Sequence, residues 1–341
     1  MIIICQVWER RDEMPGYCIG SSISENQTWF GILERSGKPL AIWSVPTLKR
    51  RGCRIVLSDM VSEIQSKLAE FRISLRDIAG IGVSVPAEVG RTGILDYCEE
   101  LGWGIVNIED ILNELSGLKV RAGSSRDMAV LGEHWVLGKN APENMVSFLV
   151  ENELRGGIIV NNRLITDRNG KSGDLAKILA MGPDAAADSR NRIMLREISS
   201  YRSMLERYRS CAEYMEKTAS VQNVHMVSGH DMQRAARAGD PLCNKILDAS
   251  ASAIAAALYN IGCTVCIEKA VIGGGEELGR ALMAEKVARF YRNLPDTSST
   301  GLVIEPSKLG KTAEVYGSAK YLLMNDMVSS ADSRGREQLK I

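Results

Sequence analysis

Histidine, aromatic residues and unbalanced charge are all scarce in this chain of 341 residues. Aromatic side chains make up 5% of the sequence, and Lys+Arg and Asp+Glu both number 42, which leaves a formal net charge of zero. A nucleic-acid-binding domain would carry a basic excess, so we expect no direct contact with DNA. The three histidines, His134, His225 and His230, are scattered and form no triad-like pattern with a nucleophile.

Long apolar runs and clustered cysteines are also missing. No run approaches the roughly 18 residues that a membrane span needs, and the N-terminal residues MIIICQVWERRDE lack the features of a secretory signal. Of the eight cysteines, only Cys263 and Cys266 lie close together, whereas a structural zinc site needs about four ligands. We therefore expect reduced thiols, no zinc, no membrane association and a cytoplasmic location.

What the sequence does contain is an ordinary globular composition, with 45% hydrophobic and 25% charged residues. Its length favours two domains, and strand and helix patterns alternate in both halves, which predicts an α/β fold. In the first half the patterns predict a hairpin over 17–47, a helix over 54–71, a strand over 78–86, a helix over 108–115, a strand over 119–123 and a helix over 124–138 with Ser124 or Ser125 as N-cap.

The second half repeats this alternation. The patterns predict a strand pair over 146–165, a polar, arginine-rich helical region over 185–217, helices over 228–241 and 244–262, a strand, glycine turn and helix start over 269–282, and a last helix over 312–328. The polar tail 329–341 is expected to be loose.

Several motifs, in order along the chain, carry a family resemblance. They are IAGIGVSVPAEV, LGEHW, GGIIVNNRLI, NGKSGDL, ARAGDPLCNKILDASASAIAAALYNIG, KAVIGGG and VYGSAKYLL. Together they resemble the ROK family (repressor, open reading frame, kinase) of bacterial sugar kinases and sugar-responsive transcription regulators, over roughly residues 17–325. The resemblance implies a two-domain actin-like, ribonuclease H-like fold, with a sugar in the cleft and ATP between the domains.

The same resemblance implies where the domains begin and end. Residues 1–125 should form an N-terminal actin-like domain and residues 126–311 a C-terminal one. The last helix, 312–328, should return to pack on the first domain. By the same resemblance, two copies of the chain are expected to form a homodimer.

The two phosphate-binding turns of the family are altered in this chain. The first, an aspartate-glycine-glycine-threonine turn, aligns with the stretch from Ser22 through Ser24 and Glu25. The second, glycine-threonine-glycine, aligns with Glu151, Asn152 and Glu153. These turns lose the glycines that allow close backbone approach, and carboxylates beside a triphosphate would each cost about 1–4 kcal/mol at ~4 Å. We expect Glu25, Glu151 and Glu153 to make the former phosphate site acidic.

The family's general base is also replaced. The asparagine-aspartate pair that holds the base aligns with Ser124 and Ser125, and a serine cannot accept a sugar proton at neutral pH. Asp127, two residues later, is a weak substitute, and its more ordinary role would be to stabilise the helix dipole. We therefore predict no catalytic residue at Ser125.

The segment that binds sugar and zinc in the family aligns with residues 173–177. Asp174 keeps a carboxylate one methylene shorter than the family's glutamate, while Lys177 replaces a hydrogen-bond acceptor with a cation. No cysteine lies between Cys98 and Cys211, so the zinc cluster cannot form locally. The sugar cleft is expected to lie between the loop 86–93, the residues Ser124–Asp127 and this segment, and Lys177 would suit an acidic sugar derivative.

Other residues have an ordinary structural explanation. Gly273, Gly274 and Gly275 match the turn near the family's adenine site, but a strand-to-helix turn needs glycines without any nucleotide. Glu133 is expected to be structural or to lie at the outer cleft, and Trp103 could pack under a sugar or belong to the core.

Three functions remain open at this point. The first is a non-catalytic ROK-like protein, a pseudokinase that uses the degenerate cleft for sugar sensing, regulation or partner binding. The alternative is a divergent glucokinase-like sugar kinase that would use ATP and magnesium, with Asp127 or Asp174 as base. The third is a scaffold without a ligand. The family's regulators carry an N-terminal helix-turn-helix, and the residues before the first matching strand are too few for its three helices.

Overall fold

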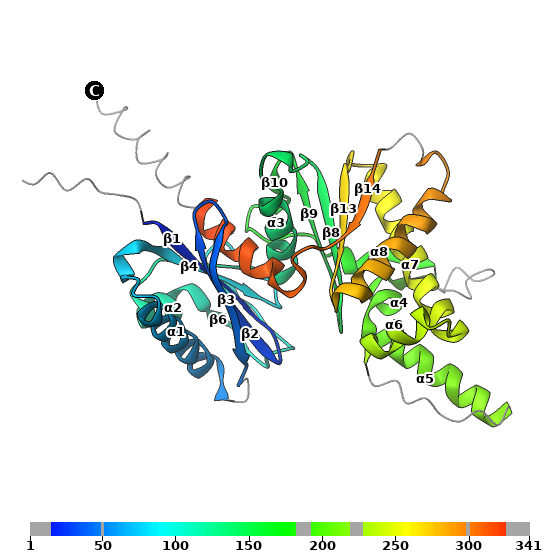
Figure 1. The fold of residues 1–341 in the computed structure, drawn as a ribbon, viewed down its shortest axis with the longest axis horizontal. Helices are drawn as coiled ribbons and strands as arrows, with labels where there is room; N and C mark the ends of the chain where they lie inside the picture. Colours follow the sequence, from blue (N-terminus) through cyan, green and yellow to red (C-terminus); the bar gives the residue numbers. More distant parts are fainter. Residues whose placement is uncertain (1–14, 49–50, 182–191, 219–227, 298–300, 325–341) are drawn as a thin grey trace, which may run out of the picture.

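Two five-stranded sheets organise the chain (Figure 1). The computed structural model describes residues 15–48, 51–181, 192–218, 228–297 and 301–324. The first sheet has the order β3-β2-β1-β4-β7 and the second the order β10-β9-β8-β13-β14. In both sheets the first three strands are antiparallel and the last three are parallel, so the two halves share one topology.

Helices from distant parts of the sequence cover the two faces of the first sheet. Its strands are β1 (Tyr17–Ile23), β2 (Gln27–Glu34), β3 (Pro39–Pro46), β4 (Ile78–Val85) and β7 (Val120–Ser124). One face packs against α1 (Cys53–Glu70) and α2 (Ile108–Ser116). A small two-stranded sheet, β5 (Ile94–Leu95) with β6 (Val106–Asn107), lies in the loop region after β4.

The helix at residues 313–324 covers the other face of the first sheet. Its side chains Val315, Ala319 and Leu322 pack against Cys18 and Leu33. The backbone N–H of Ser21 donates to Oγ of Ser318 at 3.1 Å. Residues almost 300 positions apart therefore complete one layer, and Figure 1 shows this helix, in red, beside β1 and β4.

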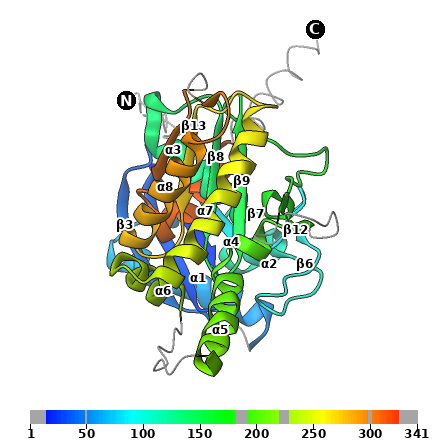
Figure 2. The ribbon, with the colours of Figure 1, turned by 90° about the vertical axis from the view of Figure 1, so that its right-hand side faces the viewer.

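The second sheet carries a larger helical layer. Its strands are β8 (Met145–Val150), β9 (Leu154–Val160), β10 (Arg163–Leu164), β13 (Lys269–Gly273) and β14 (Val303–Pro306). Its outer helices are α4 (Arg196–Ser199), α5 (Tyr201–Thr218), α6 (Gly229–Arg237), α7 (Pro241–Gly262) and α8 (Glu277–Arg292). Figure 2 shows these helices on the side away from the first sheet, whereas α3 (Ser125–Leu137) lies between the two sheets.

Buried strands explain why the sheets form where they do. All six residues of β8 are buried, as are seven of the eight residues of β4, which suits strands covered on both faces. In α1 the buried residues recur at helical spacing, at Val56, Met60, Ile64 and Leu68. Residues 27–46 form the hairpin β2–β3, and β1 adds to it on the other side.

One predicted helical region is wrong in part. Residues 192–194, within the region 185–217 that was predicted to be helical, form β12 (Arg192–Met194), which pairs antiparallel with β11 (Leu179–Met181). The pairing is possible because η4 (Leu175–Lys177) turns the chain just before β11.

Residues 182–191, 325–328 and the predicted tail 329–341 lie outside the described residues. Over the described parts of the chain, no helix combines the length and apolar character needed to cross a membrane.

Candidate functional site

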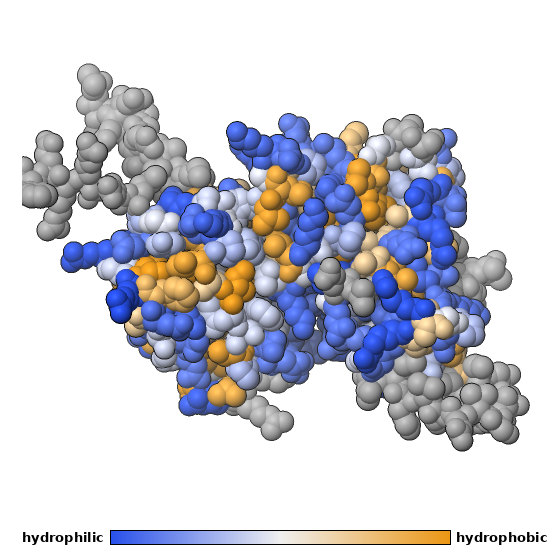
Figure 3. All heavy atoms as spheres, in the orientation of Figure 1, coloured by the Kyte–Doolittle hydropathy of each residue, from blue (hydrophilic) through white to orange (hydrophobic). Residues whose placement is uncertain are grey.

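A cleft of about 1250 Å³ separates the two halves. The β1–β2 turn, the loop after β4, the start of α3, the β8–β9 turn, η4, and parts of α4 and α5 contribute its walls. Acidic side chains outnumber lysines and arginines among the lining residues: Glu25, Glu88, Glu99, Glu100, Glu151, Glu153, Asp174 and Glu314, against Arg126, Arg155, Lys177, Arg196, Arg202 and Lys311. In Figure 3 the lower part of the boundary between the halves is mainly hydrophilic, whereas hydrophobic residues lie at its upper part.

Arg155, a residue of β9, lies in the cleft beside the altered turn at residues 151–153. Its guanidinium lies 3.1 Å from Glu100, 3.5 Å from Glu151 and 3.6 Å from Glu314. These carboxylates come from the loop after β5, the β8–β9 turn and the helix 313–324. Burial alone would lower the pKa of Arg155, but the three carboxylates together raise it, so the side chain is charged at all ordinary pH values.

Glu314 in turn engages the end of β1. Its Oε2 accepts hydrogen bonds from the hydroxyls of Ser22, at 2.5 Å, and Ser84, at 2.8 Å. Burial raises the pKa of Glu314, while Arg155 and the two hydroxyls oppose that shift. The hydroxyl of Ser22 is therefore already committed to another protein group.

The remaining residues of the two altered turns also line the cleft. They are Ser24, Glu25, Asn152 and Glu153. Glu153 pairs with Arg202 at 2.8 Å, and the backbone N–H of Glu25 donates to Glu100 at 3.3 Å. The structure thus brings Glu25, Glu151 and Glu153 to one cleft, together with arginines that partly neutralise them.

A second arginine, Arg126, organises another part of the cleft wall. Ser124, Ser125 and Arg126 line the cleft at the start of α3, where Ser124 is the N-cap residue. Arg126 donates to Glu88 at 2.8 Å and lies 3.6 Å from Asp174. This one side chain therefore connects α3 to two other segments, the loop after β4 and the segment before η4.

The structure corrects the placement of Asp127. Its side chain is 6% exposed and is not among the residues that line the cleft. It accepts a hydrogen bond from Oγ of Ser172 at 2.8 Å, and that hydroxyl accepts one from Arg126 Nε at 3.1 Å. Asp127 therefore lies behind the wall, in the first turn of α3. Burial raises its pKa to about 6, although the bond from Ser172 and the charge of Arg126 act in the opposite direction.

The predicted glycine turn borders a second group of polar residues. Gly275 lines the cleft beside Tyr201 and His230, whose rings meet edge to face with centroids 5.9 Å apart. At Gly274, where φ is +91°, an added Cβ would lie 2.3 Å from the carbonyl oxygen of Val150, so packing alone requires glycine there. Gly273 lies at the end of β13. Among the described residues, Nδ1 of His230 is buried without a hydrogen-bond partner.

Glu133 and Trp103 both belong to buried parts of the molecule. Glu133 accepts a hydrogen bond from Oγ of Ser307 and is not itself among the residues that line the cleft. Trp103 is 3% exposed and packs in the core beneath the first sheet. Within the part of the chain that the structure describes, no three His, Cys, Asp or Glu side chains are placed to hold a metal ion together.

Sequence reasoning missed the two organising arginines, Arg126 and Arg155, and the distant carboxylates Glu100 and Glu314. Arg155 carried one available signal, because a charged residue in the short strand LRGGIIV needs a partner if it is buried. The partners themselves could not be found, since they lie 55 and 159 residues away along the chain.

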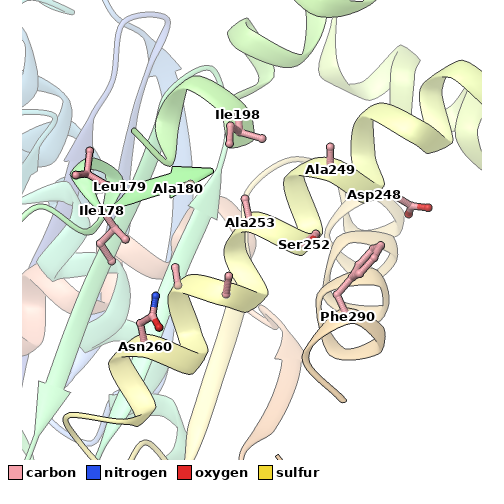
Figure 4. A pocket seen from close by; sticks show the side chains of 12 residues that line it. Ile178, Leu179, Ala180, Ile198, Asp248, Ala249, Ser252, Ala253, Asn260 and Phe290 are labelled. Atoms are coloured by element: carbon pink, nitrogen blue, oxygen red, sulfur yellow. The ribbon is translucent and has the colours of Figure 1, made fainter. Parts of the chain in front are cut away.

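A separate groove of about 550 Å³ lies on the outer surface of the second half (Figure 4). Ile178, Leu179 and Ala180 of the β11 region form one side, and α7 forms the other with small residues such as Ala249 and Ala253. This groove gathers apolar and small side chains rather than reactive ones.

Two topologically equivalent α/β halves around a deep cleft define an actin-like ATPase fold, as predicted. The chain belongs to the ROK family, whose sequence pattern matches residues 33–325. The glucokinase of Halalkalibacterium halodurans is 23% identical over 305 residues, covering 88% of this chain and 92% of the glucokinase. The xylose repressor of Caldicellulosiruptor bescii is 23% identical over 267 residues, which cover 74% of this chain and 64% of the repressor.

Solved structures agree on the fold. The ROK family glucokinase from Streptomyces griseus, in complex with glucose and AMPPNP, superposes with a TM-score of 0.72 at 19% identity. The match covers 90% of this chain and 99% of the glucokinase. At this identity the similarity establishes the architecture, whereas the chemistry of the cleft depends on the residues described above.

Proposed function

We propose that this chain binds a sugar in the cleft and acts as a non-catalytic, sensing or partner-binding member of the ROK family. The Arg155 cluster carries this proposal. The guanidinium is already surrounded by Glu100, Glu151 and Glu314, and Glu314 also engages Ser22. A triphosphate would face these carboxylates, each repelling it by about 1–4 kcal/mol at ~4 Å. The residues present do not fit the phosphates of ATP.

The sugar-side wall suits hydroxyl groups. Ser124 and Ser125 line the cleft together with Asp174, whose carboxylate can accept hydrogen bonds from sugar hydroxyls. No carboxylate stands at the position of the family's general base, and Asp127 is turned away behind Ser172. We therefore expect the cleft to bind a sugar without phosphorylating it, since general-base assistance contributes about 10²–10⁴-fold to the rate of such a transfer.

Two measurements test this proposal. Titration calorimetry with ATP in millimolar magnesium should give no binding heat. A coupled hexokinase assay should give no turnover, either in the natural chain or in Ser125→Asp, because one restored carboxylate leaves the Arg155 cluster in place. Turnover by the natural chain would overturn the non-catalytic proposal.

The second candidate is a divergent sugar kinase, and the comparisons favour it. Glucokinases align with most of this chain, and Nδ1 of His230, buried without a partner among the described residues, lies beside Gly275 near the expected adenine position. The pKa of Asp127, raised to about 6, would suit a general base if its side chain turned from Ser172 toward the cleft. ATP-dependent phosphorylation of a hexose that disappears in Asp127→Ala would establish this function and identify the base.

Thermal stability distinguishes a sensor from a ligand-free scaffold. A sugar present at 100 times its dissociation constant should add about 2.7 kcal/mol to the free energy of unfolding.

The proposal also includes a cytoplasmic location, pairing of two copies and the absence of direct DNA binding. A gel-shift assay and light scattering on the purified chain would test the last two.

A further inference from the structure

The β11–β12 ribbon brings two cations to the same end of the cleft. Leu179 pairs with Met194, and the N–H of Leu195 donates to the carbonyl of Ile178 at 2.8 Å. Lys177 immediately precedes these paired residues and Arg196 immediately follows them. Both side chains line the cleft. No sequence pattern indicated this pairing, because β12 falls in a region that was predicted to be helical.

The positive charge of this pair is not balanced by the residues around it. Asp174 lies 3.6 Å from Lys177, but it lies equally close to Arg126 and also accepts a hydrogen bond from the N–H of Ala176. Its single negative charge is therefore shared between two cations. The side chain of Arg196 forms no ion pair or hydrogen bond in the described part of the chain.

The nearby carboxylates are engaged elsewhere. Glu197, the neighbour of Arg196 in sequence, accepts a hydrogen bond from the N–H of Met194 at 2.6 Å. Glu153 pairs with Arg202. Among the described residues, this half-buried guanidinium has no carboxylate partner and lies next to an ammonium that shares its own, so an anion could bind both without breaking an ion pair of Arg196.

We propose that Lys177 and Arg196 form a binding site for an oxyanion, a carboxylate or a phosphate, carried on the sugar that occupies the cleft. This inference rests on the proposed sugar-binding function and names the class of ligand. The guanidinium of Arg196 binds two oxygens of the anion, and Lys177 supplies a point charge beside it. Asp174 and the serines at the start of α3 remain available for the sugar hydroxyls.

Titration calorimetry on the full chain tests the site. The probes are glucose, galactose and mannose, their 6-carboxylate and 6-phosphate derivatives, and inorganic phosphate. At least one sugar anion should bind about tenfold or more tightly than both its neutral parent and inorganic phosphate, as expected for a charge-assisted pair. Arg196→Gln and Lys177→Gln should each reduce that preference about tenfold, while affinity for the neutral parent changes less than about twofold. Arg209→Gln, which changes an exposed arginine of α5 outside the cleft, should leave all affinities unchanged.

Each outcome has a clear meaning. Carboxylate and phosphate arms show which oxyanion the site takes, and a preference for either one supports the site. Equal binding of neutral and anionic sugars, or an unchanged preference in both glutamine variants, overturns the anion site but leaves sugar binding intact. Inorganic phosphate that binds as tightly as the sugar anion also overturns it. Absence of binding by every sugar overturns the proposed function itself.

Discussion

Burial and hydrogen bonding have opposite effects on the pKa of the Asp127 carboxyl group. Burial raises the pKa of Asp127 from 3.8 to about 6, while Ser172 and Arg126 favour its charged form. The folded state therefore binds more protons than the unfolded state between roughly pH 4 and pH 6. Because of this difference, the free energy of unfolding falls as pH rises through that window, and the full cost of the buried charge is present above pH about 6.

Asp127→Asn should remove this cost. Asparagine keeps an oxygen that can accept the bond from Ser172, but it carries no charge. Above pH 7 we expect the variant to be more stable than the natural chain by about 2–3 kcal/mol, which is roughly two pKa units of protonation linkage. Near pH 4 the two should differ little. Urea denaturation at pH 4, 5, 6 and 8 measures this, and equal stability at every pH would show that the carboxyl group is not effectively buried.

The sequence predicted most residues of the cleft wall but not their partners. Ser125, Asp174, Lys177 and the altered turns were identified because they align with motifs of a family whose turns are recognisable. Arg155 was visible only as a charge within a strand. Two of its three carboxylates, Glu100 and Glu314, come from segments far away in the chain, and no local pattern specifies which distant side chains meet in the folded protein.

Among the elements, β9, the loop after β5 and the helix 313–324 are joined through one side chain, Arg155. Arg155→Met keeps much of the volume but leaves the neighbouring carboxylates, among them Glu100 and Glu314, close together without a cation. Breaking a buried pair in this way should cost about 3–5 kcal/mol in the free energy of unfolding. Chemical denaturation at pH 7.5 would measure the loss.

Arg202→Met provides a matched control. Arg202 is exposed and, among the described residues, pairs with Glu153, so its loss should cost at most about 1 kcal/mol. Adding Glu314→Gln to Arg155→Met should recover part of the stability, since the two changes act on one ionic cluster. Equal losses for the two single variants would mean that the Arg155 cluster does not stabilise the fold.

Helices and strands with strong periodicity were predicted well, and the exception is instructive. The pattern of Ile64 and Leu68 in α1 records one buried face, so a short window of sequence suffices. β12 has three residues within a polar stretch, and it is a strand only because β11 lies beside it. Pairing between segments more than ten residues apart is not visible in either segment alone.

On the scale of the whole molecule, two helices cross between the sheets with almost no side chains separating them. A Cβ added at Gly317 would lie 1.7 Å from the carbonyl oxygen of Met128 in α3, and one added at Gly132 would lie 1.9 Å from that of Ala313. Such contacts require the backbones to touch. The spacing of the two halves around the cleft therefore depends on these two glycines.

Gly317→Ala should separate the helices and destabilise the fold by about 1–3 kcal/mol, the usual cost of overpacking. The control is Gly262→Ala at the end of α7, where the nearest atom to an added Cβ is 3.9 Å away. That change should be neutral or stabilising, because alanine favours helices more than glycine. Thermal unfolding compares them. Two variants of equal stability would contradict a tight helix crossing.

The helix 313–324 also has a consequence for how the protein is made. It covers β1, yet it follows β1 by nearly 300 residues, as the bond between Ser21 and Ser318 shows. During synthesis, the second sheet with its helices, residues 145–306, is complete before this helix exists. One apolar face of the first strands therefore stays uncovered until residues 313–324 have left the ribosome, so the half that is translated first finishes folding after the second sheet has been made.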